Sequence, residues 1–227
     1  LSTVSRENVD VAAECLSLGA ADYIEKPAMA NLRDRADEIR SKLKLAAKKL
    51  KKSSSNPTVE KEFIRKFRIT NPERKLRAFY VGLGDLNDIK QILSSVGPSD
   101  PPIVVVPDTN PDLFKDMLAG QKKINFTDKL RDWPQPGSIT VVSQEGFLGL
   151  SLPQSHLVSI WFSRIPPQSF QSWINAKREN LILVLNDQEP SHEESTFAKN
   201  CDYCVPFISY ISVSDEMFVK RLERKAA

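Results

Sequence analysis

Residues 77–119 read RAFYVGLGDLNDIKQILSSVGPSDPPIVVVPDTNPDLFKDMLA, and they indicate the fold class more clearly than any other part of the chain. Two runs of aliphatic and aromatic residues, 77–82 and 102–106, each have the length of one buried strand. The segments 88–96 and 111–119 that follow have apolar residues three and four positions apart, which predicts helices. Strands that alternate with helices predict an α/β fold with a mainly parallel sheet.

Further elements extend this pattern toward the C-terminus. A core strand is predicted at 180–185, after a helix at 168–178, and a last helix is predicted at 215–224. Apolar residues at 138–143 and 147–150, separated by a Gln-Glu-Gly turn, predict a β-hairpin. The predicted domain is therefore an α/β sheet, mainly parallel, that contains one hairpin.

The composition is that of a globular protein. The chain has 227 residues, of which 41% are hydrophobic and 27% are charged, so we expect one or two domains. Neither a signal peptide nor a run of about 18–20 apolar residues is found, so no membrane span is predicted. Three cysteines, Cys15, Cys201 and Cys204, do not make a disulfide framework, and a cytoplasmic location is expected.

Charge and composition divide the chain into three parts. Residues 40–77 hold 14 Lys and Arg against three Glu, a net charge of +11 within a chain whose total is +3. The composition changes at Ser53-Ser-Ser-Asn-Pro57, which predicts a basic linker over 53–76 between domains at 1–52 and 77–227. The charge run could attract nucleic acid or an anionic membrane surface, but a solvated linker is preferred. No helix-turn-helix pattern follows it, which disfavours a DNA-binding regulator.

The N-terminal segment has a recognisable order of elements. LSTVSRENVDVAAECLSLGAADYIEKP, residues 1–27, contains a hydroxyl residue, an amphipathic helix, Gly-Ala, a short Asp-Tyr-Ile strand and Lys-Pro. This order resembles the second half of a phosphorylatable receiver domain of two-component systems, which has a flavodoxin-like fold. The resemblance implies that Ser2 and Lys26 contact the phosphoryl group on an acceptor Asp.

The first half of such a receiver, which carries the acceptor Asp and the acidic pocket, does not precede this segment. The chain begins at Leu1, without Met, and we interpret it as a fragment. Half a receiver would expose the apolar face of its remaining sheet. Mg²⁺ is expected as a cofactor only if the missing half is present.

A helix predicted before the linker carries a heptad pattern. Its apolar residues are spaced alternately by four and three, with charged residues between them. Such a stripe fits a homodimeric coiled coil and equally fits packing of the last receiver helix on its own sheet, and both alternatives stay open. The stripe consists of Leu32, Ala36, Ile39, Leu43, Ala46 and Leu50.

The second domain resembles the receptor methylesterases of bacterial chemotaxis, in which a linker joins a receiver to an α/β hydrolase-like domain. The resemblance rests on the order of elements and on three segments, FYVGLGDLN at 79–87, PIVVVPDTNPDLF at 102–114 and QPGSITVVS at 135–143. It implies a response regulator in chemotaxis-type signalling. A sensor kinase or a chemoreceptor complex would be the partner.

The catalytic Ser-His-Asp triad of that family is not matched. The serine position falls at Gly84 or Asp85, the histidine position at Asp108, and the late aspartate is represented at best by Asp187. Without the serine and its base the hydrolase loses its nucleophile. We therefore expect a methylesterase-like domain that acts by binding another protein. The alternative is an active esterase or amidase with another nucleophile, such as Ser143 or Ser151.

Two other groups of residues have possible chemical roles. Asp85, Asp108 and Asp187 each follow a predicted strand, so together they fit a Mg²⁺ or acid–base site. We prefer turn and helix-capping roles, which are common for Asp. Cys201-Asp-Tyr-Cys204 has the spacing of zinc and redox motifs, but no second pair accompanies it, and two structural thiols are preferred.

Overall fold

The computed structural model describes residues 36, 39–44, 71–118, 124–186, 190–207, 210, 215, 218, 220–222 and 224. Most of the expected receiver segment and linker therefore lies outside the described residues. The same holds for Ser2, Lys26, Leu32, Leu50 and Asp187, whose predicted roles stay predictions.

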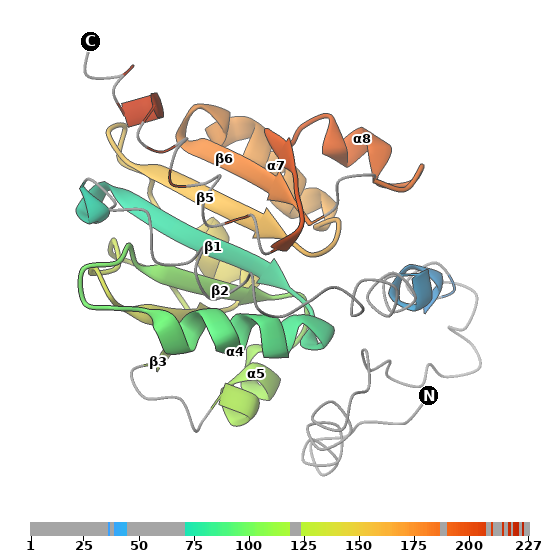
Figure 1. Ribbon diagram of the computed structural model, residues 1–227, viewed down its shortest axis with the longest axis horizontal. Helices are drawn as coiled ribbons and strands as arrows, with labels where there is room; N and C mark the ends of the chain where they lie inside the picture. The colour runs from blue at the N-terminus through green and yellow to red at the C-terminus, as the bar shows by residue number, and fades with distance from the viewer. Residues whose placement is uncertain are drawn as a thin grey trace, which may run out of the picture.

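The described part of the chain is built on one seven-stranded sheet in the order β3-β4-β2-β1-β5-β6-β7 (Figure 1). Every pair of neighbouring strands is parallel, which confirms the predicted α/β class with a parallel sheet. The strands are β1 (Lys75–Val81), β2 (Ile103–Pro107), β3 (Ile124–Thr127), β4 (Ile139–Val142), β5 (Leu157–Phe162), β6 (Leu181–Leu185) and β7 (Tyr203–Cys204).

The central strands are buried along their whole length. All seven residues of β1 and all six of β5 are buried, and Phe79 of β1 is in register with Trp161 of β5. Continuous apolar runs are typical of parallel strands, because helices cover both faces of the sheet. β1 begins at Lys75, inside the residues that were expected to belong to the linker.

Helices form a layer on each face of the sheet. α4 (Leu86–Ser95), α5 (Pro111–Leu118) and helical residues between 207 and 224 pack on one face. α6 (Gln144–Leu148), α7 (Gln168–Lys177) and α8 (Ser195–Ala198) pack on the other. Short 3₁₀ turns occur at Pro72–Arg74, Leu83–Asp85 and Arg178–Asn180.

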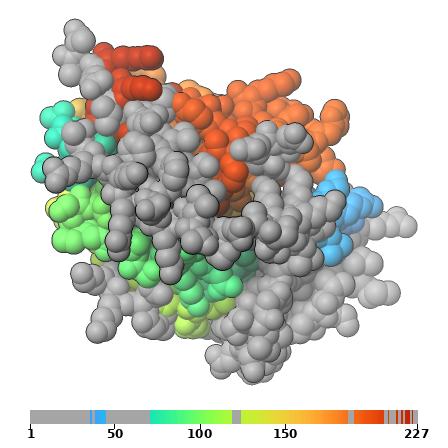
Figure 2. All heavy atoms as spheres, viewed as in Figure 1, coloured from blue at the N-terminus to red at the C-terminus, as the bar shows by residue number. Residues whose placement is uncertain are grey.

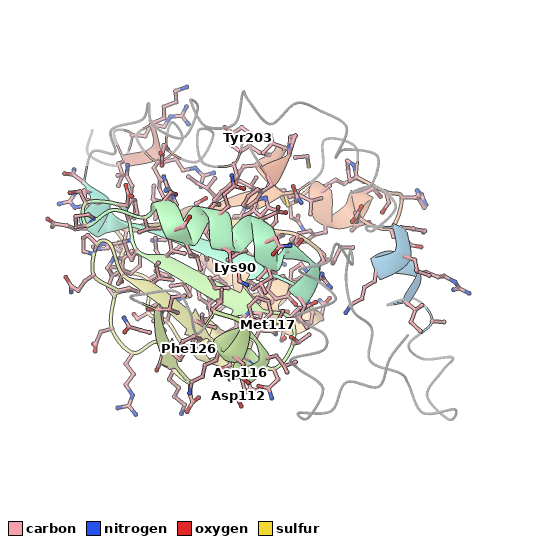
Figure 3. The ribbon with its side chains drawn as sticks, turned by 60° about the horizontal axis from the view of Figure 1, so that its bottom comes forward. Lys90, Asp112, Asp116, Met117, Phe126 and Tyr203 are labelled. Atoms are coloured by element: carbon pink, nitrogen blue, oxygen red, sulfur yellow. The ribbon has the colours of Figure 1, made fainter. Side chains whose placement is uncertain are left out.

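The outer helices show the amphipathic pattern that the sequence predicted. α4 buries Ile89, Ile92 and Leu93 against the sheet. On α5, Asp112 and Asp116 are four residues apart and exposed at the outer side of this layer (Figure 3). No described helix is both long and apolar enough to cross a membrane.

The predicted hairpin at 138–150 is wrong. β4 ends at Val142, and α6 begins directly after Ser143, whose hydroxyl oxygen accepts a hydrogen bond from the Gly146 amide at 3.1 Å. This N-cap satisfies an amide that would otherwise lack a partner at the helix start. Phe147 then packs on the sheet, stacked on Phe170 with ring centroids 5.7 Å apart.

The other predicted elements are confirmed where the structure describes them. The strand at 180–185 and the helices at 88–96, 111–119 and 168–178 agree with β6, α4, α5 and α7 within a few residues at each end. Residues 215, 218, 220–222 and 224 are helical, as predicted for the last helix. Strands β3, β5 and β7 were not predicted.

Candidate functional site at the carboxyl edge of the sheet

The sheet reverses its direction of winding between β1 and β5. The chain passes from β1 to β2 on one side, whereas it passes from β5 to β6 on the other side of the same pair. Open α/β sheets bind ligands outside the carboxyl ends of strands at such a point. The residues that follow β1, β2 and β5 therefore form the candidate ligand-binding site.

Three charged side chains meet at this edge. The Arg164 Nη1 atom, just after β5, lies 2.6 Å from Oδ2 of Asp108, just after β2. Its Nη2 atom lies 3.7 Å from Oδ2 of Asp85 in the turn after β1. All three side chains are at least 85% buried. A buried group of charges such as this one is stable only while each charge lies next to an opposite charge.

Gly82 makes room for the arginine. A Cβ atom added at Gly82 would lie 1.8 Å from Nη2 of Arg164, so the guanidinium group rests where any other residue would place a side chain. The Gly82 amide also donates to Oδ2 of Asp85 at 3.0 Å. The turn after β1 is therefore shaped around Arg164 at one point and around Asp85 at another.

Backbone hydrogen bonds fix where the loops after β2 and β5 start. The Asp108 amide donates to the Val81 carbonyl at 2.8 Å, and the Ser163 amide donates to the Tyr80 carbonyl at 3.1 Å. Each bond continues the sheet by one residue beyond the end of a strand. Asp108 and Arg164 consequently leave the sheet at defined positions on the two sides of β1.

A pocket of about 550 Å³ opens beside this ion-pair cluster. Its walls come from the carboxyl edge, from the start of α7, from residues 191–194 and from the helical segment 39–44. Figure 2 shows the segment 39–44 (blue) next to residues close to α8 (orange). The described lining residues are Ser41, Lys42, Lys44, Tyr80, Asp108, Thr109, Gln144, Arg164, Ile165, Pro167, Ser191, Glu193 and Glu194.

The segment 39–44 faces this pocket with its basic side chains. Lys42 is buried, and Lys44 forms an exposed ion pair with Glu193 at 3.5 Å. Leu43, a residue of the predicted heptad stripe, is 61% exposed. An exposed Leu43 does not support packing of this stripe on the described part of the chain, and the predicted dimer remains a prediction.

The pocket wall also contains polar groups that remain uncharged. Burial, together with the negative charge of Asp108, raises the pKa of Tyr80, so its phenol keeps its proton. The Thr109 hydroxyl is buried and has no hydrogen-bond partner among the described residues. The wall therefore offers hydrogen-bonding groups next to its charges.

The aspartates predicted from the sequence are only partly explained by capping. Asp85 accepts a turn hydrogen bond, as expected, but the amide of Asp112 at the start of α5 is capped by Asn110 and not by Asp108. Asp85 and Asp108 do meet at one edge, as the paired-carboxylate alternative required. However, Arg164 is bound to both, and no described group of acidic, Cys or His residues could hold a metal ion.

Arg164 was missed in the sequence analysis. Its partners follow strands that are far apart in the sequence, so no local motif connects them. The available signal was the apolar run LVSIWF of β5, which places the next charged residue at the carboxyl edge. Gly84, the other candidate for the serine position, lies half-buried in the turn after β1.

Among the described residues, no histidine hydrogen-bonds to either alternative nucleophile, Ser143 or Ser151. Ser143 is held as the cap of α6, and its hydroxyl donates to the Asp128 carbonyl at 3.2 Å. Ser151 is exposed beyond that helix. His156 comes just before β5, at the opposite end of the strand from Arg164, and its ring contacts Trp133 at 4.7 Å. None of the described lining residues is a histidine.

The two C-terminal cysteines are partly buried free thiols. Burial raises the pKa of Cys201 to about 12, and the neighbouring Cys204 adds to this effect. A thiol that keeps its proton is a poor nucleophile and a poor metal ligand. This arrangement agrees with the predicted structural role.

Comparisons with models of protein families and with curated proteins find no match to this chain. The candidate site is therefore interpreted from its own geometry and from the resemblances given above.

Proposed function

We propose that this chain is a response regulator in chemotaxis-type signalling whose α/β output domain acts by binding another protein. The partner class is a sensor kinase or a chemoreceptor complex. The receiver-like N-terminal segment supplies the signal input, and phosphorylation of a complete receiver alters the contact between receiver and output domain.

One observation carries the proposal for the output domain. The resemblance places the catalytic serine at Gly84 or Asp85 and the histidine at Asp108, and Arg164 joins the two aspartates in a buried cluster. A hydroxyl nucleophile needs a neighbouring base to remove its proton, and carboxylates neutralised by a guanidinium group cannot replace that pair. The cluster therefore favours a structural role for these three residues, next to a surface that binds another protein.

The contact at the pocket mouth suits reversible regulation. The Lys44–Glu193 pair is more than half exposed on both sides, and exposed pairs contribute only about 0–1 kcal/mol. A competing charge can therefore replace this pair without a large loss of free energy. Ile165, 37% exposed at the same pocket, then offers an apolar contact to the partner.

Binding is tested by measuring the affinity of the full chain for a reconstituted complex of chemoreceptor and sensor kinase, with Ile165→Asp as the variant. A charge at this apolar position should weaken binding at least tenfold and leave the fold unchanged. Ser151→Asp, at an exposed site after α6, serves as the matched control. Absence of binding by the unchanged chain, or equal affinities for all three proteins, would contradict the proposal.

The lost triad is tested with a serine-directed fluorophosphonate. We expect no covalent adduct, because the pocket lacks a histidine among its described residues. Intact-protein mass spectrometry reports the result, with an active serine esterase as the positive control. A stoichiometric adduct at any serine would favour the hydrolase alternative.

A further inference from the structure

The two outer strands at the β3 edge of the sheet differ from the central strands in the polarity of one face. Their apolar residues that pack on the side of α4 and α5 are Ile124, Phe126, Ile139 and Val141. Side chains alternate between the two faces along a strand, so the residues between them point to the other face. There, Asn125 of β3 lies directly beside Thr140 of β4. Parallel sheets usually bury apolar residues on both faces, and this polar strip departs from that rule.

A pocket of about 780 Å³ lies over the polar strip, and we call it the β3–β4 pocket. Loop 128–137, which connects the two strands, forms much of its wall. Ligand sites typically have volumes of about 300–1,000 Å³. None of its described lining residues belongs to the carboxyl-edge pocket. They are Asn125, Thr127, Asp128, Lys129, Leu130, Arg131, Asp132, Trp133, Pro134, Gln135, Ser138 and Thr140.

Hydrogen bonds hold the loop of this pocket at both ends. At its start, the Ser143 hydroxyl donates to the Asp128 carbonyl at 3.2 Å. A Cβ atom added at Gly146 would lie 2.1 Å from that carbonyl oxygen, so the loop lies directly against α6. At its end, the Gly137 amide donates to the Asp100 carbonyl at 2.7 Å. The pocket is therefore formed before any ligand binds, which lowers the entropic cost of binding.

Thr140 brings a polar group without a partner into the pocket. The residue is only 6% exposed, its side chain lines the pocket, and its hydroxyl has no hydrogen-bond partner among the described residues. A hydroxyl group in such a position costs free energy unless water or a ligand binds it. Thr127, in contrast, uses its hydroxyl in a turn with Lys129. Thr140 therefore indicates a polar ligand.

Trp133 is the one aromatic residue among the described lining residues. Its ring meets the His156 ring edge to face, with centroids 4.7 Å apart, and this contact fixes its orientation. Its indole nitrogen is buried and has no hydrogen-bond partner in the part of the chain that the structure describes. An aromatic ring offers an apolar surface to the C–H groups of a ligand.

The charged residues around the pocket balance one another. Two are acidic and two are basic, and all four are exposed: Asp128, Asp132, Lys129 and Arg131. A wall without net charge gives no preference for an anion such as nucleic acid. Carboxylate, guanidinium, amide and hydroxyl groups together form hydrogen bonds with neutral hydroxyl groups, which both donate and accept. The pocket therefore fits an uncharged ligand that carries many hydroxyl groups.

We propose that the β3–β4 pocket binds an uncharged saccharide. The Trp133 ring packs against the C–H face of one sugar ring, and Asn125 and Thr140 form hydrogen bonds with its hydroxyl groups. A peptide that adds a strand to the sheet would instead pair with the outer backbone of β3, in the plane of the sheet. Thr140 lies on the second strand and would not contact such a peptide. This site goes beyond the proposed function and does not rest on it.

An array of immobilised neutral and acidic glycans, probed with the full chain, tests the proposal. We expect binding that is confined to uncharged glycans and that the same oligosaccharide, free in solution, inhibits. Binding only to acidic glycans, or no binding above background, would overturn the proposal.

Titration calorimetry with the strongest-binding neutral oligosaccharide then tests the residues. Thr140→Val keeps the shape of the side chain and removes the hydroxyl, so it should weaken binding about fivefold. Trp133→Ala should weaken it about tenfold. Asn125→Ala, an exposed change that leaves the fold intact, should act like Thr140→Val. Thr196→Val, at an exposed position of α8, is the matched control and should bind like the unchanged chain.

Nuclear magnetic resonance of the unchanged chain locates the bound oligosaccharide. The side-chain amide signal of Asn125 and the indole signal of Trp133 should shift when it is added. Shifts confined to the backbone amides of β3, or equal affinities of Thr140→Val, Asn125→Ala and the unchanged chain, would overturn the proposal.

Discussion

Two clusters of buried charge in this molecule differ in how they are balanced and closed. At the carboxyl edge, Arg164 serves two carboxylates beside an open pocket. On the face below the C-terminal segment, Lys75 and Arg77 share the single carboxylate of Asp215 in a site without solvent. The first cluster joins one guanidinium group to two carboxylates, and the second joins one carboxylate to two cations.

The two clusters differ in whether solvent can reach them. Water or an incoming polar group can reach charges that line a pocket, as Asp108 and Arg164 do. A cationic excess under a packed segment has neither, so it is relieved only by loss of a proton or by movement of the segment. The two clusters should respond very differently to the same kind of substitution.

The largest effect is expected when the buried cluster loses the carboxylate of Asp215. Asp215→Asn removes the ion pair with Arg77 and the negative charge near Lys75, and it should lower the free energy of unfolding by about 4 kcal/mol. Urea denaturation of the full chain measures this change. Asp112→Asn, exposed on α5, is the matched control and should alter stability by less than about 0.5 kcal/mol. A loss below about 1 kcal/mol in Asp215→Asn would show that the site is not sealed.

Removal of the shared cation at the open cluster should have a smaller effect. Arg164→Ala removes the cation that Asp85 and Asp108 share, but the pocket lets water reach Asp108, so we expect a loss of about 3 kcal/mol. Arg178→Ala breaks a more exposed pair with Asp202 and should cost about 1 kcal/mol. Urea denaturation measures the free energy of unfolding of both variants. Equal losses would show that the Arg164 cluster contributes no more than the more exposed Arg178–Asp202 pair.

The close approach of Arg164 to the backbone gives a sharper test of the same cluster. Gly82→Ala places a methyl group where the guanidinium lies and should cost about 2 kcal/mol. The cost should nearly vanish in an Arg164→Ala background, because the clashing group is gone. A double-mutant cycle measures this coupling, and additive effects would contradict the geometry.

The smallest effect is expected at the mouth of the pocket. Lys44→Ala removes the exposed pair with Glu193 and should change the free energy of unfolding by less than about 1 kcal/mol. The effect should disappear in 0.5 M NaCl, because exposed charges are screened by salt. A loss that is larger and insensitive to salt would mean that the segment 39–44 is held as part of the core.

Periodic apolar patterns explain how much of the fold could be predicted. α4, α7 and β6 have either helical spacing or a continuous apolar run, and their packing on the sheet uses those same residues. The hairpin prediction failed because apolar residues at 147–150 fit a strand and a helix equally well. The cap at Ser143 decides between them, and its partner is a backbone amide that no residue type reveals.

The candidate site was predicted in its location but not in its chemistry. Asp85 and Asp108 were identified because each follows a strand, and carboxyl ends of parallel strands meet at one edge. Arg164 could not be assigned to them from the sequence, since strand β5 had not been recognised and its position beside β1 depends on the order of the whole sheet.

The most direct test of the proposed function is methanol release from methylated chemoreceptor by the full chain, with and without acetyl phosphate. An active receptor methylesterase provides the reference rate. Because the proposed resemblance puts Gly84 or Asp85 at the serine position and Asp108 at the histidine position, and Arg164 joins the two aspartates, we predict no release above the buffer control in either condition. Catalytic turnover that depends on the chain would contradict the account and would place a nucleophile elsewhere in the domain.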